Sequence, residues 1–104
     1  MLRGEVWWVD FPPPIGRRPA VLISRNAAYS RRTSVTAIPV TTTVRNIRSY
    51  VALGQEDGMP RACAASADDI TTVPVGSIMN RITALTDEKV RALEDAVRFA
   101  LAMG

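Results

Sequence analysis

The chain has 104 residues, a length that suits one compact domain, 1–104, and is too short for two independent hydrophobic cores. Apolar residues make up 47% of it and aromatic residues only 6%, so Val, Ile, Leu and Ala must build most of the core. The only cysteine, Cys63, excludes an internal disulfide. The absence of histidine excludes a Cys/His zinc site, and any metal chemistry would have to rest on carboxylates.

The net charge of +3 divides unevenly along the chain. Residues 1–50 carry eight Arg against two acidic residues, a net charge of +6, whereas residues 51–104 carry five basic and eight acidic residues, a net charge of −3. Twelve of the thirteen basic residues are Arg, whose planar fork binds phosphate through two donors. An Arg-rich, high-GC genome is an alternative explanation of the Arg to Lys ratio, but it does not explain the clustering. The N-terminal half is therefore a candidate anion-binding face.

The sequence also allows a prediction of where in the cell the protein is found. No apolar run approaches the roughly 18 to 20 residues that span a membrane, and the first five residues lack the charged and apolar regions of a secretory signal. We therefore expect a cytoplasmic protein without a membrane partner.

The first two predicted strands form a hairpin. Residues 5–11 are rich in strand formers and end at three consecutive prolines, which cannot continue a ladder. A turn that contains the basic pair Arg17 and Arg18 leads into residues 19–24, a nearly continuous apolar run that indicates a strand buried on both faces.

The middle of the chain predicts shorter elements. Residues 26–29 suit a short helical turn, and residues 34–40 suit a third strand, whose end Pro39 would place at an edge or a bulge before the polar triplet Thr41, Thr42 and Thr43. A fourth strand is predicted at 49–53 and a turn at 54–58. Residues 61–67 fit a strand or a helix equally, and 70–75 and 77–82 indicate short strands.

The C-terminal segment has the pattern of an amphipathic helix that ends near Met103. Thr86 is a suitable N-cap, two acidic residues follow it, and one helical face carries apolar side chains at Val90, Leu93, Val97, Ala100 and Leu101. Strands followed by one terminal helix predict a mainly β fold with helices (α+β), best fitted by a small SH3-like β-barrel with the helix packed on it.

Three blocks of the sequence resemble a known family. They are RGEVWWVDF at residues 3–11, RPAVLIS at 18–24 and IPVTTT at 38–43. Their order and approximate separation are similar to those of MazF/PemK toxins, and a weaker DDITTV block at 68–73 with the terminal helix extends the resemblance over essentially the whole chain.

The resemblance implies the toxin of a type II toxin–antitoxin system with the MazF/PemK/CcdB-like barrel fold. Such a toxin is a homodimeric, metal-independent endoribonuclease that needs no cofactor, cuts single-stranded RNA (mRNA, tRNA or rRNA) at a short motif and thereby inhibits translation and growth. Its partner would be a cognate antitoxin whose extended, acidic tail occupies the RNA groove.

The resemblance implies two catalytic residues, Arg18 before the proline of the second strand and Thr41 at the end of the third. RNA supplies its own nucleophile, because the ribose 2′-OH attacks the neighbouring phosphorus to give a 2′,3′-cyclic phosphate and a 5′-OH. The protein must then hold the phosphate in line and stabilise the added negative charge. Proton transfer stays open between Glu5, Asp69 and solvent, since no group has an unperturbed pKa near neutrality.

Further side chains are candidates for RNA contact. One of the two tryptophans, Trp7 and Trp8, should face the core and the other a base or a dimer interface, because they lie on opposite faces of one strand. Each charged candidate also has a structural alternative: Arg18 could pair with Asp69 or Glu5. The predicted RNA-binding set is Arg17, Arg25, Thr42, Thr43, Arg45, Arg48 and Asp69.

The sequence departs from the family pattern in two places. The loop 12–17 is several residues shorter than in many relatives, and Asp69 replaces the Gln or Asn that they often carry. These departures keep open one alternative, an SH3-like RNA-binding or regulatory module without activity. The shared barrel gives another, a binder that inhibits DNA gyrase, like CcdB. The Arg18 and Thr41 pair argues against the gyrase inhibitor, which has no need of it.

Overall fold

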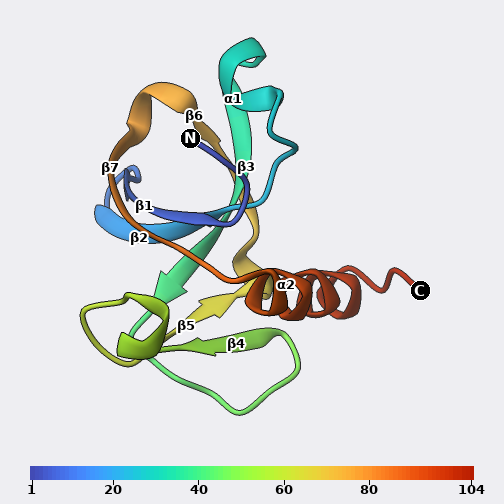
Figure 1. The fold of residues 1–104 in the computed structure, drawn as a ribbon. Helices are drawn as coiled ribbons and strands as arrows, with labels where there is room; N and C mark the ends of the chain where they lie inside the picture. The colour runs from blue at the N-terminus through green and yellow to red at the C-terminus, as the bar shows by residue number, and fades with distance from the viewer.

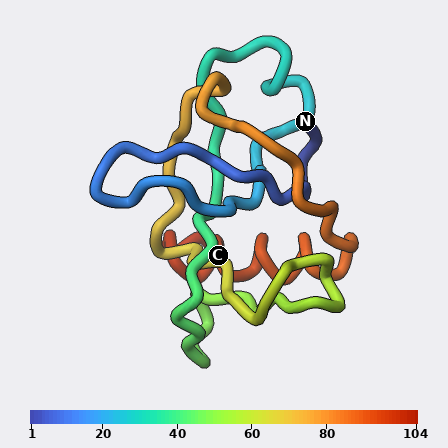
Figure 2. Tube along the Cα trace, turned by 90° about the vertical axis from the view of Figure 1, so that its left-hand side faces the viewer, coloured from blue at the N-terminus to red at the C-terminus, as the bar shows by residue number.

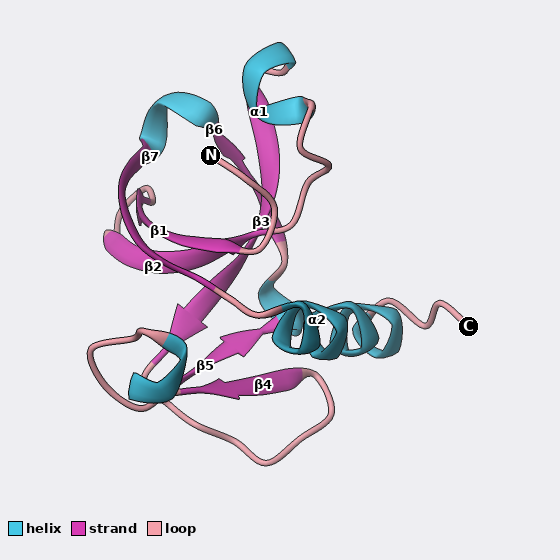
Figure 3. Ribbon diagram, in the orientation of Figure 1, coloured by secondary structure: helices cyan, strands magenta, loops and turns pink.

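Seven strands, all paired antiparallel, two α-helices and three 3₁₀ helices make up the computed structural model, which describes residues 1–104 (Figures 1 and 3). The mainly β architecture with a C-terminal helix is the one predicted. In chain order the elements are β1 (Glu5–Asp10), β2 (Arg17–Leu22), α1 (Ala28–Arg31), β3 (Ser34–Thr41), β4 (Tyr50–Leu53), η1 (Gln55–Asp57), β5 (Cys63–Ser66), η2 (Ala67–Asp69), β6 (Thr71–Pro74), η3 (Val75–Ser77), β7 (Ile78–Ala84) and α2 (Asp87–Ala100).

The strand order is β4-β5-β3-β2-β1-β7, and β6 pairs with the first half of β3. One edge of β3 therefore has two partners, β6 along Ser34 to Ala37 and β5 along Val40 and Thr41. Pro39 lies between these two pairings. The strand does not end at Pro39 but continues to Thr41, where Val40 and Thr41 pair with β5. Pro39 pairs with Ala20 of β2 and has no partner along the other edge, as expected for a proline at an edge or a bulge. The missing N–H of proline falls where that edge changes partner.

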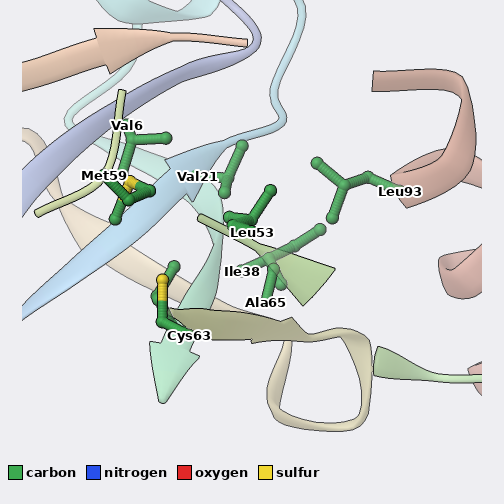
Figure 4. Packing of buried hydrophobic residues seen from close by; sticks show 9 residues of the cluster. Val6, Val21, Ile38, Leu53, Met59, Cys63, Ala65 and Leu93 are labelled. Carbon is green, nitrogen blue, oxygen red and sulfur yellow. The ribbon is translucent and has the colours of Figure 1, made fainter. Parts of the chain in front are cut away.

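The first hydrophobic cluster lies between the sheet and α2. Figure 4 shows Val6, Val21 and Ile38 from the three central strands facing Leu53 of β4 and Leu93 of α2. Val6, Val21, Ile38 and Leu93 are completely buried. Each buried side chain of this size contributes about 1.5 to 3 kcal/mol to the free energy of folding, so this cluster fixes how α2 sits on the sheet.

A second cluster fills the curve of the sheet formed by β1, β2, β3, β6 and β7. It contains Val9, Leu22 and Val73, with Ala28 of α1 closing one side. Trp7 packs against this cluster, as predicted for one of the two tryptophans. Together the clusters contain the second half of β2 and most of β3.

The helix α2 confirms the predicted N-cap. The Thr86 side chain accepts a hydrogen bond from the backbone N–H of Lys89 at 3.2 Å, and Leu93 is buried on the predicted face. The helix ends at Ala100, three residues before the predicted end, and Leu101 is half exposed rather than part of the buried face. Figures 1 and 2 show α2 on the side of β4 and η2, which it contacts, away from the β1–β2 hairpin tip.

Two further boundaries differ from the prediction. The helical turn expected at 26–29 lies at Ala28–Arg31, because the residues before it carry the chain away from the end of β2. The segment 61–67, which fitted a strand or a helix equally, contains the strand β5. Pairing with both β3 and β4 makes this segment a strand, and composition alone cannot reveal that pairing.

None of the helices combines the length and the apolar composition that crossing a bilayer takes.

Candidate functional site

The start of β2 and the end of β3 bring Arg18 and Thr41 together. The ladder between β2 and β3 ends at the pair Ala20 and Pro39, and Arg18 and Thr41 lie two residues beyond that pair on the two strands, where both line the same cavities. On its other side Arg18 pairs with Val9 of β1. The hairpin turn fixes this register, because the N–H of Phe11 donates to the carbonyl of Gly16 at 3.1 Å. In Figure 1 the end of β3 reaches the neighbourhood of β5.

Two surface cavities meet at this pair. One has a volume of about 510 Å³ and the other about 540 Å³, both within the range of small-molecule sites. Arg18, Val40 and Thr41 line both cavities. A chain-like ligand could therefore lie in both cavities at once, with Arg18 and Thr41 at the point where it passes from one to the other.

The first of these, called cavity 1 below, lies between the end of β1 and the β5–β6 region. Apart from Arg18 its charged groups are two carboxylates, Asp10 and Asp69. Five hydroxyl-bearing side chains also line it: Thr41, Ser66, Thr71, Thr72 and Ser77. Cavity 1 thus offers mostly hydrogen-bond acceptors and hydroxyls.

The second, called cavity 2 below, lies between the start of β2 and the loop before β5. Three arginines line it, Arg17, Arg18 and Arg61, and no acidic residue does. The Arg17 guanidinium carbon lies 5.2 Å from the centroid of the Trp8 ring, a cation–π contact that holds both side chains at the cavity wall. Cavity 2 is therefore suited to anions and to stacking.

Arg18 is exposed and takes part in none of the four ion pairs of the chain, so the alternative pairing with Asp69 or Glu5 does not occur. The Thr41 hydroxyl accepts a hydrogen bond from the N–H of Thr43 at 3.1 Å. That contact leaves the hydroxyl proton available for a ligand. The pair can thus present a bidentate cation and a hydroxyl donor to one phosphate.

The other predicted contacts divide into two groups. Arg17, Thr42 and Thr43 line cavity 2, and Asp69 lines cavity 1. The structure does not bring Arg25, Arg45 or Arg48 to either cavity. Arg25 follows the far end of β2, and the Arg48 guanidinium lies over the Phe99 ring of α2 at 4.4 Å.

Glu5 is not placed to transfer a proton at this site, which corrects one sequence expectation. It begins β1, four residues from Val9, a separation of about 13 Å along a strand. Burial raises the pKa of Glu5, but hydrogen bonds from the Trp7 indole, the backbone of Leu2 and the Arg81 guanidinium outweigh it and lower the pKa overall. Glu5 therefore has a structural role.

Sequence reasoning missed several residues of the two cavities. Arg61 was counted with the acidic half of the chain, yet it lies in cavity 2 because β5 brings its preceding loop beside the end of β3. Asp10 belongs to the first block of the resemblance but was given no role there, and Ser66 belongs to no block; tertiary pairing places both in cavity 1. The buried Cys63 also lines cavity 2, and burial, followed by the charge of Asp57, raises the pKa of its thiol.

Comparison with known proteins identifies the class to which this arrangement belongs. Residues 2–101 match the family model of the PemK-like, MazF-like toxins of type II toxin–antitoxin systems. A probable endoribonuclease, MazF5 of Mycobacterium tuberculosis, is 40% identical over 100 residues, which cover 95% of this chain and 91% of that protein.

Solved structures agree with this match. A mycobacterial endoribonuclease in complex with its cognate antitoxin has a TM-score of 0.88 at 28% identity, covering 100% of this chain and 97% of its own. The Mycobacterium tuberculosis toxin MazF-mt6 has a TM-score of 0.88 at 25% identity, with 96% and 98% covered. The chain therefore belongs to the MazF-like toxins of type II toxin–antitoxin systems, and its activity is that of an endoribonuclease.

Proposed function

We propose that the chain cleaves single-stranded RNA without a metal, by attack of a ribose 2′-OH on the adjacent phosphorus, with the phosphate held by Arg18 and Thr41. The meeting of cavities 1 and 2 at these two residues carries the proposal. An RNA strand that crosses from one cavity to the other brings one phosphate to that point. The products are a 2′,3′-cyclic phosphate and a 5′-OH.

Arg18 and Thr41 act on the charge that develops at the phosphate. Arg18 donates two hydrogen bonds to the non-bridging oxygens and Thr41 donates one, which stabilises the additional negative charge of the transition state. A single preorganised donor of this kind contributes on the order of 3 to 4 kcal/mol. Of the carboxylates considered for proton transfer, Asp69 shares a cavity with the pair, whereas Glu5 does not.

The cavities also suggest how the toxin is neutralised. We propose a cognate antitoxin whose extended acidic tail lies on the three arginines of cavity 2 and excludes RNA. The solved complex of a mycobacterial endoribonuclease with its antitoxin supports such a partner. We further propose a cytoplasmic homodimer of one domain per chain, acting on mRNA, tRNA or rRNA.

The experiment incubates the purified chain and its Arg18→Ala variant with total cellular RNA in EDTA, and maps the new RNA ends. We expect discrete cuts with 5′-OH ends from the chain, and almost none from the variant, because the largest donor to the phosphate is gone. An Arg91→Ala variant, altered at an exposed position on α2 outside both cavities, should cut like the parent. Intact RNA at high protein concentration, or equal cutting by Arg18→Ala, contradicts the proposal.

A further inference from the structure

The two cavities differ in the groups they present to a ligand. Cavity 2 has three arginines and no acidic residue, whereas cavity 1 has Asp10 and Asp69 against Arg18 alone. A carboxylate repels phosphate oxygens and accepts hydrogen bonds from amino groups. The ligand part that enters cavity 1 should therefore present donors rather than negative charge, and in a nucleic acid the amino groups of the bases do so.

Ser66 gives an independent indication of a ligand in cavity 1. Its side chain is only 1% exposed, and its hydroxyl is the one buried side-chain polar atom in the chain without a hydrogen-bond partner. Leaving such a group unpaired is destabilising, because it loses its hydrogen bonds to water without replacement. Ser77, by contrast, lies in the same cavity but already donates to the carbonyl of Pro74 at 2.7 Å. Ser66 thus lines cavity 1, and its hydroxyl, which is covered from solvent, has no partner within the chain.

The position of Ser66 relates it to Asp69. Ser66 ends β5, and η2 carries Asp69 three residues later, so one short turn brings a free hydroxyl and an exposed carboxylate to the same cavity. The neighbouring carboxylate of Asp68 is engaged differently, because it accepts a hydrogen bond from the Ser49 hydroxyl at 2.6 Å. Asp69 takes part in no ion pair. Its oxygens are therefore available to a ligand.

We infer that cavity 1 reads a base next to the cleaved phosphate, and that Asp69 and Ser66 select a base that carries an exocyclic amino group over uracil. Cytosine presents an N4 amino donor where uracil presents an O4 acceptor. Asp69 accepts from that amino group, and the Ser66 hydroxyl, which can donate or accept, bonds a second atom of the base edge. The inference rests on the proposed function, because it assumes that RNA is the ligand of the two cavities.

The test compares the binding of short deoxycytidine and deoxyuridine oligonucleotides at one fixed salt concentration. The two differ in the base alone, and neither has the 2′-OH that the proposed cleavage requires, so base selection is measured apart from catalysis. We expect the deoxycytidine oligonucleotide to bind at least about fivefold more tightly. The Asp69→Asn amide can donate as well as accept, so this variant should lower the ratio to near one.

Matched variants separate base reading from general effects. Asp95→Asn removes the same charge as Asp69→Asn, but at an exposed position of α2. Ser34→Ala removes the same hydroxyl as Ser66→Ala, but at the exposed start of β3. Both positions lie outside the cavities, so both variants should keep the binding ratio of the parent. Ser66→Ala should lower the ratio without lowering the melting temperature, because the removed hydroxyl has no partner within the protein.

Several outcomes would overturn the inference. They are equal binding of the two oligonucleotides, tighter binding of deoxyuridine, no binding of either, an unchanged ratio in Asp69→Asn, and a lower melting temperature in Ser66→Ala. If the chain cuts RNA but shows no preference for deoxycytidine, base selection is refuted and the proposed cleavage is not. The preference without RNA cutting supports base selection and refutes the proposed cleavage.

Discussion

Arg18 stands at the start of β2 with its guanidinium free of any carboxylate in the chain. Arg3, by contrast, is paired with Glu94 at 2.7 Å. Thr41, which lines both cavities with Arg18, has a hydroxyl proton to donate. At the scale of single residues, the site therefore consists of donors held ready for an anion.

Replacing Arg18 by lysine tests whether the planar fork matters or only the charge. Lysine keeps the positive charge but offers a point donor instead of two parallel N–H groups, so we expect cleavage to slow by about 10²-fold. Single-turnover cleavage of a defined RNA measures this. An Arg91→Lys variant makes the same exchange on the exposed face of α2 and should cut at the parent rate.

Glu5 yields a prediction about acid stability. The pKa of Glu5 lies below 4.5 in the folded chain, so its carboxylate adds stability at pH values above 4.5, and that stability is lost as the pH falls through the folded pKa. The melting temperature of Glu5→Gln should be lower than that of the parent near neutral pH, and the difference should shrink below pH 4.5. A difference that stays constant into the acid range argues against this linkage.

At the residue scale, the sequence could predict those site residues that a motif carries. Arg18, Arg17, Thr41 and the following threonines do lie together at the cavities. The position of Ser66 in cavity 1 has no local signal, because it depends on how β5 pairs with β3 and β4. Arg25 illustrates the opposite error: nearness to Arg18 along the chain is lost when β2 extends between them.

The strand β3 and the helix α2 decide the shape of the site at the scale of elements. β3 is paired along both edges, so its end at Thr41 is held by β5 while its middle is held by β2. The helix α2 packs on the first hydrophobic cluster through Leu93 and leaves the cavities uncovered. The N-cap and the apolar spacing of α2 are local features of the sequence, so the sequence predicts this helix well. The change of partner at Pro39 depends on tertiary pairing, which no local pattern shows.

Two leucines of α2 test how this helix is held. Leu93 is completely buried and Leu101 is half exposed, although both belong to the predicted apolar face. Leu93→Ala should lower the free energy of unfolding by about 2 to 5 kcal/mol. Leu101→Ala should change it by less than about 0.5 kcal/mol. Chemical denaturation measures both, and equal losses would mean that the end of the helix is also packed.

At the scale of the whole molecule, the uneven charge of the sequence becomes a contrast between two cavities. The count by halves assigns Arg61 to the acidic half, but the fold carries it across to Arg17 and Arg18. The opposite halves thus meet at one surface. Composition could predict an anion-binding face, but not that an acceptor-rich cavity adjoins it, because that depends on the pairing of distant strands.

The cationic cavity predicts how RNA binding depends on salt. Arg17→Ala and Arg61→Ala should each weaken binding and each reduce the slope of log affinity against log salt concentration by about 0.7, since each removes one contact to phosphate. Titrations of a labelled RNA at several salt concentrations measure the slope. Arg91→Ala, outside both cavities, should leave it unchanged. Unaltered slopes in the first two variants would show that RNA does not lie in cavity 2.

The central claim is that RNA supplies the nucleophile while Arg18 and Thr41 hold the phosphate. It is tested most directly with a mapped RNA substrate in EDTA, in which a single 2′-deoxy nucleotide replaces the nucleotide on the 5′ side of the cut. We predict that this substitution abolishes cleavage at that bond while the RNA still binds, and that a 2′-deoxy nucleotide elsewhere leaves cleavage intact. Continued cutting at the substituted bond would contradict the account.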